Sequence, residues 1–292
     1  MEIRLLKYFL ETANEENITR AAAKLHITQP SLSRQLAHLE SELGRKLYAR
    51  ESAGIRLTEE GVLLKKRAEE ILDLVDKTRS ELSESSKAIT GTVYIAAGET
   101  AGIRHVARVL RRMREEFPAV RYRMISGDYE DVADKLDKCL TDFGLFVGKV
   151  NLNKYECITL PYSDRWGAVV RADDPLAKRK FIKPQDLLGR ELLFSHQAKT
   201  HGEFSEWLNA SAESLDIIGT HNLAFNASVM VREGLGILIT IEGIVNGEGL
   251  KFIPLKPELK AGLVLAWRKG AVLSKAARKF LELAGETQPL LS

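Results

Sequence analysis

Two short amphipathic helices meet in the stretch AAAKLHITQPSLSRQL, residues 21–36. The alanines at 21–23 allow the first helix to pack closely against a neighbour. Residues 26–28 are too few for anything but a turn. Pro30 suits the first turn of the next helix, because a backbone N–H is not needed for intrahelical bonding there. Two helices joined by so tight a turn predict a helix-turn-helix.

A further helix precedes this motif, because apolar residues recur with the spacing of one helical face at Leu6, Phe9, Leu10 and Ala13. Asn17 and Thr28 are candidate N-caps of the two motif helices. The second of these helices turns polar side chains outward, and their donors and acceptors suit the base edges and phosphates of DNA. An ordinary surface helix has the same composition, so both interpretations remain open at this point.

A β-hairpin is predicted directly after the motif. Gly44 should end the preceding helix as a C-cap glycine. The strand-like segments 46–48 and 55–57 then flank a turn, which gives a wing beside the helix-turn-helix. Arg50 and Arg56 are placed to reach the sugar-phosphate backbone of DNA.

A long helix follows the hairpin. Thr58 is a candidate cap, and the acids Glu59 and Glu60 complement the helix dipole. Packing on its own domain would explain the apolar seam of this helix, but we favour dimerisation, because two recognition helices would then read two half-sites. The predicted seam consists of Leu64, Ala68, Ile71, Val75, Thr78 and Leu82, which step by three and four residues.

Residues 21–36, together with Leu39-Glu40, Leu43-Gly44, Leu47–Arg50 and Leu57–Gly61, closely resemble the LysR-type transcriptional regulators. The resemblance is long and specific. It implies a winged helix-turn-helix, a linker helix for dimerisation and a C-terminal ligand-sensing region, together with homotetramers and DNA bending.

The resemblance also implies which residues face DNA. The wing tip, 52–54, departs from the family because it lacks the basic residue that many relatives carry there. Arg50 lies at the base of the wing, and Arg56 is a candidate phosphate contact. The expected DNA-binding residues are Thr28, Gln29, Pro30, Ser31, Ser33, Arg34, Arg50 and Arg56.

After residue 90 strands and helices alternate, which is typical of an α/β fold with a mostly parallel sheet. We expect a two-lobed effector domain of the periplasmic-binding-protein type. The expected division is a winged helix-turn-helix domain at 1–58, a linker and dimerisation helix with a hinge at 59–90, and an effector domain at 91–292, with lobe I at about 91–161 plus 266–292 and lobe II at about 162–265.

Ligands in such folds lie at the carboxyl ends of strands, against helix N-termini. Polar loop residues at these ends can also be simple helix caps, and their convergence on one cleft is what the family resemblance implies. The expected effector-binding residues are Glu99, Thr100, Ser126, Gly127, Gly148, Ser195, His196, Gln197, Asn222, Asn226 and Thr240.

Two features of this cleft depart from the family. The segments 171–177 and 231–237 look like recurrent effector-domain sequences, but Thr240 stands where a proline usually follows the second. Glu99 puts a negative charge where many relatives have none. If Glu99 faces the cleft, a neutral or cationic ligand is favoured over a simple dianion.

Composition excludes several other classes of protein. The chain has 292 residues, 45% of them hydrophobic, a net charge of only +3 and two cysteines, which are expected to be reduced thiols. There is no apolar run of membrane-spanning length, no signal-peptide pattern, no metal-ligand spacing among the six histidines, and no Gly-x-Ser-x-Gly or phosphate-loop motif. An enzyme, a cofactor and a metal site are therefore not expected.

The sequence thus predicts a cytoplasmic, sequence-specific regulator of transcription that is controlled by a small-molecule effector. The expected partners are double-stranded operator DNA, the effector, a homodimer or homotetramer and, for an activator, RNA polymerase; no membrane is expected. A solute-binding protein, a cytosolic enzyme and a ligand-free DNA-binding protein are the alternatives.

Overall fold

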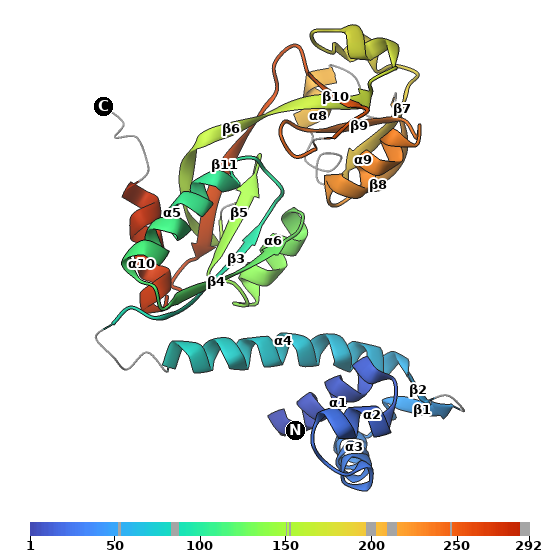
Figure 1. Cartoon of the computed structure of the whole chain (residues 1–292), viewed down its shortest axis with the longest axis vertical. Coiled ribbons are helices and arrows are strands. Elements are labelled where there is room, and N and C mark those ends of the chain that lie inside the picture. The colour runs from blue at the N-terminus through green and yellow to red at the C-terminus, as the bar shows by residue number, and fades with distance from the viewer. Residues whose placement is uncertain are drawn as a thin grey trace. The chain divides into compact units, whose positions relative to one another are not determined.

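The computed structural model describes residues 1–51, 54–82, 88–149, 151, 153–196, 203–208, 215–245 and 247–286. The chain divides into two compact units, Met1–Ser83 and Glu84–Ser292, and each is described by itself (Figure 1). Within these residues no helix has both the length and the apolar character that crossing a membrane requires.

The N-terminal unit begins with the helices α1 (Ile3–Glu15), α2 (Ile18–Lys24) and α3 (Gln29–Leu43). Their shared core includes Phe9, Leu32 and Leu36, each at most 1% exposed. Asn17 caps α2 as predicted, because its side chain accepts the backbone N–H groups of the second and third residues of the helix. Thr28 occupies the N-cap position of α3, but its side chain makes no capping hydrogen bond, which corrects that prediction.

The wing is an antiparallel hairpin of β1 (Tyr48–Glu51) and β2 (Gly54–Leu57). Thr58 then begins the long helix α4 (Glu59–Leu82). Its hydroxyl accepts the N–H of Gly61 at 3.0 Å and donates to the carbonyl of Lys46 at 2.7 Å, so the cap also fixes the wing to the helix.

The predicted seam of α4 is used in part within its own domain. Ala68 is completely buried in a cluster with Leu6 of α1 and Leu72, and Leu64 and Ile71 pack against the same cluster. Ala68 therefore has no exposed surface for a partner helix, which corrects its assignment to the dimer contacts. The large apolar side chains that α4 leaves exposed are Val62, Leu63, Leu74 and Leu82.

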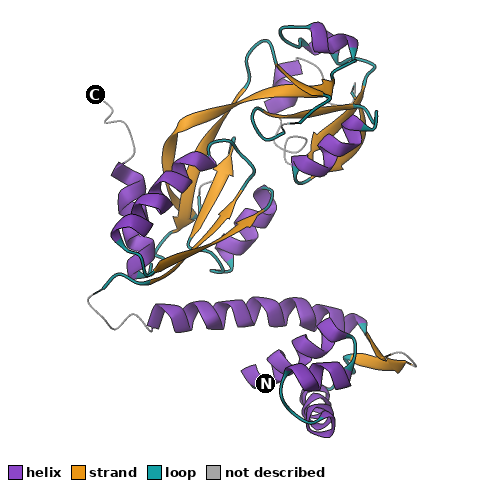
Figure 2. Ribbon diagram, in the orientation of Figure 1, coloured by secondary structure: helices purple, strands orange, loops and turns teal. Residues whose placement is uncertain are grey.

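The first lobe of the C-terminal unit contains a sheet between helices (Figure 2). Strand β3 pairs in parallel with β4 and β5, and α5 and α10 cover one face of this sheet while α6 covers the other. The elements are β3 (Gly91–Ala97), α5 (Ile103–Glu116), β4 (Val120–Ser126), α6 (Tyr129–Asp137), β5 (Phe143–Val147) and α10 (Lys275–Glu286).

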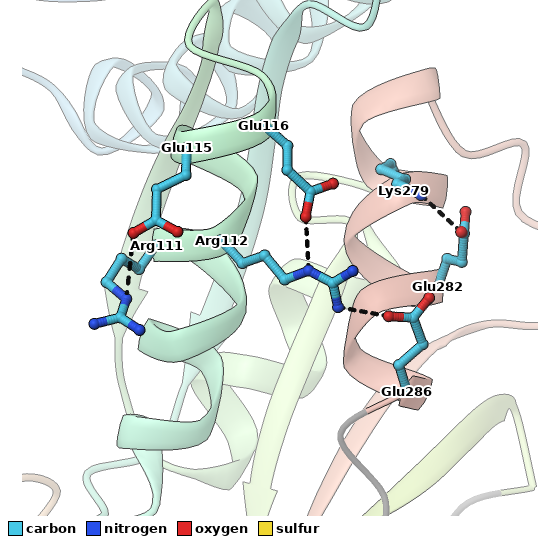
Figure 3. A network of polar contacts seen from close by, with 7 residues as sticks. All are labelled: Arg111, Arg112, Glu115, Glu116, Lys279, Glu282 and Glu286. Atoms are coloured by element: carbon cyan, nitrogen blue, oxygen red, sulfur yellow. Dashed lines mark hydrogen bonds and ion pairs between the residues drawn. The ribbon is translucent and has the colours of Figure 1, made fainter.

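An ion-pair network on the surface joins α5 to α10 (Figure 3). Arg112 lies at its centre, with Nε 2.7 Å from Glu116 of its own helix and Nη1 2.5 Å from Glu286 of α10. Each of these side chains is more than a third exposed, so the network adds little stability by itself. The buried contacts beneath it, centred on Phe143 and Phe280, hold the helices to the sheet.

The second lobe is built in the same style. Strand β7 pairs in parallel with β8 and β9, and α9 packs against Val169, Leu193 and Leu238 of this sheet. The elements are η1 (Pro175–Lys178), η2 (Pro184–Asp186), β7 (Glu191–Ser195), α8 (Glu203–Leu208), β8 (Asp216–His221), α9 (Ala224–Arg232), β9 (Ile237–Ile241) and β10 (Leu250–Pro254).

Two neighbouring antiparallel strands, β6 (Tyr155–Arg171) and β11 (Lys260–Arg268), connect the lobes. In its first part β6 pairs with β11, and in its last part it pairs with β9 and β10. The ladder between β6 and β11 shifts register where Leu263 opposes Leu160 but Gly262 opposes Ser163. Pro161 and Tyr162 are therefore left without ladder partners on β11 at the passage between the lobes.

The prediction of a mostly parallel sheet is wrong, because the strands that pass between the lobes pair antiparallel. The sequence predicts a strand at 166–170, so it misses the first half of β6, and it also misses all of β10. The sequence predicts a helix from Tyr129 to Leu140, but α6 ends at Asp137. Cys139 has a positive φ of 58°, which a continuing right-handed helix does not allow.

Candidate functional site

The start of α3 presents the predicted recognition residues. Buried leucines such as Leu32 and Leu36 fix the inner face of α3, and Thr28, Pro30 and Arg34 are exposed on the other side. Gln29, Ser31 and Ser33 are half-buried, and Gln29 donates its side-chain N–H to the Ser33 hydroxyl at 2.8 Å. The structure thus gathers these residues on the first turns of one helix, the part that enters a DNA groove in helix-turn-helix proteins.

The wing adds two exposed arginines to this surface. Arg50 lies on β1, and Arg56 lies on β2 with its Nε 2.7 Å from a carboxylate oxygen of Glu51. Both partners of this ion pair are well exposed, so water competes for it and a phosphate could replace Glu51. Residues 52 and 53 of the predicted wing tip lie outside the described part of the chain.

Glu40 of α3 fixes the position of the wing. Its side chain is buried and accepts the backbone N–H of Leu47 at 2.8 Å, while Lys46 Nζ lies 2.7 Å from its other oxygen. This ion pair raises the pKa of Lys46. No sequence pattern pointed to a positioning role for Glu40, because that role depends on contacts beyond the end of its helix.

An open hollow lies between the two lobes of the C-terminal unit, and its volume of about 520 Å³ includes space that is open to solvent. It is formed where strands β3, β7, β8 and β9 end, and the first residue of α9 faces it. Its lining consists of Gly98, Glu99, Gly127, Asp128, Val147, Trp166, Ser195, His221, Asn222, Ala224, Thr240, Ile241 and Ile244.

The structure brings some of the predicted effector residues together and separates others. The predicted residues that line the hollow are Glu99, Gly127, Ser195, Asn222 and Thr240. Thr100 and Ser126 line an adjoining hollow of about 580 Å³, to which Glu99 also contributes. Gly148, His196 and Asn226 line neither of these two, and Gln197 lies outside the described residues.

The Glu99 side chain links the two lobes by a hydrogen bond. Its Oε2 accepts the backbone N–H of Ala224, the first residue of α9, at 2.7 Å. The N-cap residue of that helix, Leu223, has no side chain that could accept such a hydrogen bond. A carboxylate from lobe I therefore supplies the cap of a helix in lobe II, and it occupies the position at which helix N-termini bind anions.

Thr100, the next residue, positions this loop. Its hydroxyl donates to Asp164 Oδ2 at 2.5 Å and accepts the N–H of Gly102 at 2.8 Å. Asp164 lies on the passing strand β6 and is 1% exposed, and its burial raises the pKa of this carboxyl group. Thr100 is thus a buried support for the loop of Glu99.

Two ring systems in the hollow carry polar atoms without partners. The Trp166 Nε1 and both ring nitrogens of His221 are buried and make no hydrogen bond of normal geometry within the described chain. Burial lowers the pKa of His221, and the Leu223 backbone raises it by a smaller amount. The ring is therefore neutral at pH 7. Sequence reasoning missed both residues, although the place of Trp166 at the start of a predicted strand was a usable signal.

The described residues contain no group of three or more histidine, cysteine or acidic side chains that could hold a metal ion. Both cysteines are free thiols. Cys139 Sγ accepts a hydrogen bond from Arg268 Nη1 at 2.8 Å, and Cys157 is exposed on β6.

Comparisons with known proteins match both units. Residues 3–62 match the bacterial regulatory helix-turn-helix protein, lysR family, and residues 86–289 match the LysR substrate binding domain. The uncharacterized regulator YwbI of Bacillus subtilis is 30% identical, with 97% of this chain and 95% of that protein covered. Another from the same organism, YybE, is 27% identical over 96% of this chain and 97% of its own.

Solved structures share the fold. The crystal structure of CbnR, a LysR family transcriptional regulator, is similar with a TM-score of 0.77 and 20% identity, covering 98% of this chain and 99% of that one. Full-length CbnR in complex with its target DNA is similar with a TM-score of 0.75 and 21% identity, covering 99% of this chain and all of that one.

Proposed function

Because the chain belongs to the LysR family of DNA-binding transcriptional regulators, we propose that a small molecule held between the lobes of its C-terminal unit controls its action on DNA. The observation that carries this proposal is the hollow of about 520 Å³, whose lining comes from both lobes. A ligand that touches both lobes binds differently when they approach or separate. It can therefore shift the population between two arrangements of the domain.

The DNA-reading part of the proposal rests on the start of α3 and on the wing. Thr28, Gln29, Ser31, Ser33 and Arg34 would face the major groove, with Pro30 shaping the turn that presents them. Arg50 and Arg56 would hold the phosphates on either side. Both arginines are exposed, as this role requires.

The protein would act as a homodimer or homotetramer through α4. The apolar side chains still available for a partner helix include Leu63 and Leu74, which are 59% and 41% exposed, and the predicted seam residues Val75 and Leu82. We retain the functional division into 1–58 for DNA binding, 59–90 for linkage and 91–292 for effector binding. RNA polymerase would be a further partner if the protein activates transcription, in the cytoplasm where the DNA lies.

The test is selection of fragments from the source genome by the purified full chain at physiological salt, followed by footprinting of the retained fragments. A protected, two-fold symmetric site next to a small set of genes is the expected result, and the pathway of those genes narrows the choice of effector. If no fragment is enriched over random DNA, with or without extracts of small molecules, the proposal fails.

A further inference from the structure

We propose that Glu99 is a built-in anion that closes this cleft to carboxylate effectors, so that the effector carries a positively charged amino group. The inference rests on the proposed function, because it assigns a ligand class to the same hollow. Its starting point is the hydrogen bond from the Ala224 N–H to Glu99 Oε2, which spans the two lobes.

A free helix N-terminus is a general anion site, because its backbone N–H groups and the helix dipole both favour negative charge. Two such N-termini reach the lining of the hollow, and the chain's own carboxylates fill both. Glu99 occupies the start of α9. Asp128 occupies the start of α6, where it accepts the N–H of Asp131 at 3.0 Å in a capping box. An effector carboxylate that bound at either of these two N-termini would have to displace the resident one.

The charged side chains that line the hollow also favour a cationic ligand. Among the described residues that line the hollow, Glu99 and Asp128 are acidic and none is lysine or arginine. His221 is held neutral by its burial, so it offers no cation to an incoming anion. In these caps Asp128 accepts through Oδ1 and Glu99 through Oε2, and the other oxygen of each carboxylate can accept from an ammonium group.

The uncharged part of the lining fits the rest of such a ligand. The unpartnered Trp166 Nε1–H can donate one hydrogen bond to a ligand acceptor, such as a carbonyl or hydroxyl oxygen. The Trp166 ring also lines the hollow, and aromatic faces attract cations. Val147, Ile241 and Ile244 supply an apolar wall for a short carbon chain. The complementary molecule is therefore a small amine with a neutral polar group.

Three probes of similar size and different charge test the inference: propylammonium, propionamide and propionate. Each is titrated into the full chain by calorimetry at fixed ionic strength. The wild-type chain should bind propylammonium at least tenfold more tightly than propionate. In Glu99→Ala the start of α9 is open, and propionate should bind at least tenfold more tightly than it does to the wild type.

Two further variants separate charge from shape and from folding. Glu99→Gln keeps an acceptor for Ala224 and fills the same space, so it should lose propylammonium binding without gaining propionate binding. Glu248→Ala removes an exposed carboxylate of the same unit, and its binding profile should match that of the wild type. Equal responses of the wild type to propylammonium and propionate, including no response to either, overturn the inference. So does a Glu99→Ala protein that gains no propionate binding.

The DNA experiment distinguishes this inference from the proposed function. A protein that selects operator DNA and responds to a carboxylate keeps the proposed function but refutes the amine effector. A protein that selects propylammonium and enriches no DNA refutes the regulator function, while the assignment of charge selectivity to the cleft stands.

Discussion

Glu40 connects the recognition helix to the wing, so its removal should weaken the N-terminal unit alone. The side chain is 6% exposed and accepts the Leu47 N–H at 2.8 Å. Leu47 is itself 2% exposed. In Glu40→Ala this buried N–H loses its acceptor, and water cannot easily replace it.

The expected magnitude follows from these contacts. A buried backbone N–H left without a partner costs about 1–3 kcal/mol. The contact with Lys46 adds little to this, because the Lys46 side chain is 79% exposed and water competes for the ion pair. For a domain of this size, a loss of 1–3 kcal/mol lowers the melting temperature by roughly 5–20 °C. Glu40→Gln keeps a carbonyl oxygen for Leu47 and should cost less than about 1 kcal/mol.

The sequence supplies an internal control for the assay. All three tryptophans, Trp166, Trp207 and Trp267, lie in the C-terminal unit. Tryptophan fluorescence therefore follows the melting of that unit, while far-UV circular dichroism also follows the helices α1 to α4. Glu40→Ala should lower the dichroism transition and leave the fluorescence transition in place. Equal losses in Glu40→Ala and Glu40→Gln would show that the charge matters rather than the hydrogen bond, and would refute the reasoning.

The other predictions concern DNA, assembly and pH. Arg34→Ala should weaken operator binding by about 1–3 kcal/mol per half-site and relax base specificity, as measured by fluorescence anisotropy. An equal loss of binding to random DNA would instead indicate a phosphate contact, and the dependence of the binding constant on salt would then fall by about one ion. Leu74→Glu should dissociate the dimer in light scattering, because an apolar contact would then hold an unpaired charge, whereas Leu74→Met should leave it intact; a dimer that survives the glutamate excludes this face of α4. Because burial lowers the pKa of His221 in the folded chain, the unfolded chain binds more protons below pH 6.5, and the stability of the C-terminal unit should fall from pH 7 to pH 5. His221→Gln should flatten that fall in fluorescence-detected melting, and an unchanged slope in this variant would count against the buried neutral ring.

Local signals in the sequence predicted local structure well. Asn17 caps α2 and Gly44 ends α3 with a positive φ of 65°, because both roles depend on the residue and its nearest neighbours. Thr28 shows the limit of such signals. It stands at the N-cap position, but its side chain makes no capping bond there.

The parts that sequence reasoning missed depend on distant residues. Ala68 fits a heptad seam, yet the neighbour that buries it is Leu6, more than sixty residues earlier. The hydrogen bond between Glu99 and Ala224 joins residues 125 positions apart. The sequence predicts the effect of Glu99 on ligand charge if this residue faces the cleft. It does not predict which backbone group the side chain contacts. His221 likewise became a candidate only when folding left its ring nitrogens without partners.

The break in the ladder between β6 and β11 has a mechanical consequence. Where Pro161 and Tyr162 lack partners on β11, the hydrogen bonds that resist twisting of the sheet are interrupted. Proline has no N–H with which to repair the ladder. Both connections between the lobes pass through this one region, so we expect rotation of one lobe against the other to centre there. A ligand that contacts both lobes would then change mainly the angle between them. Little of its binding energy would go into other distortions of the domain.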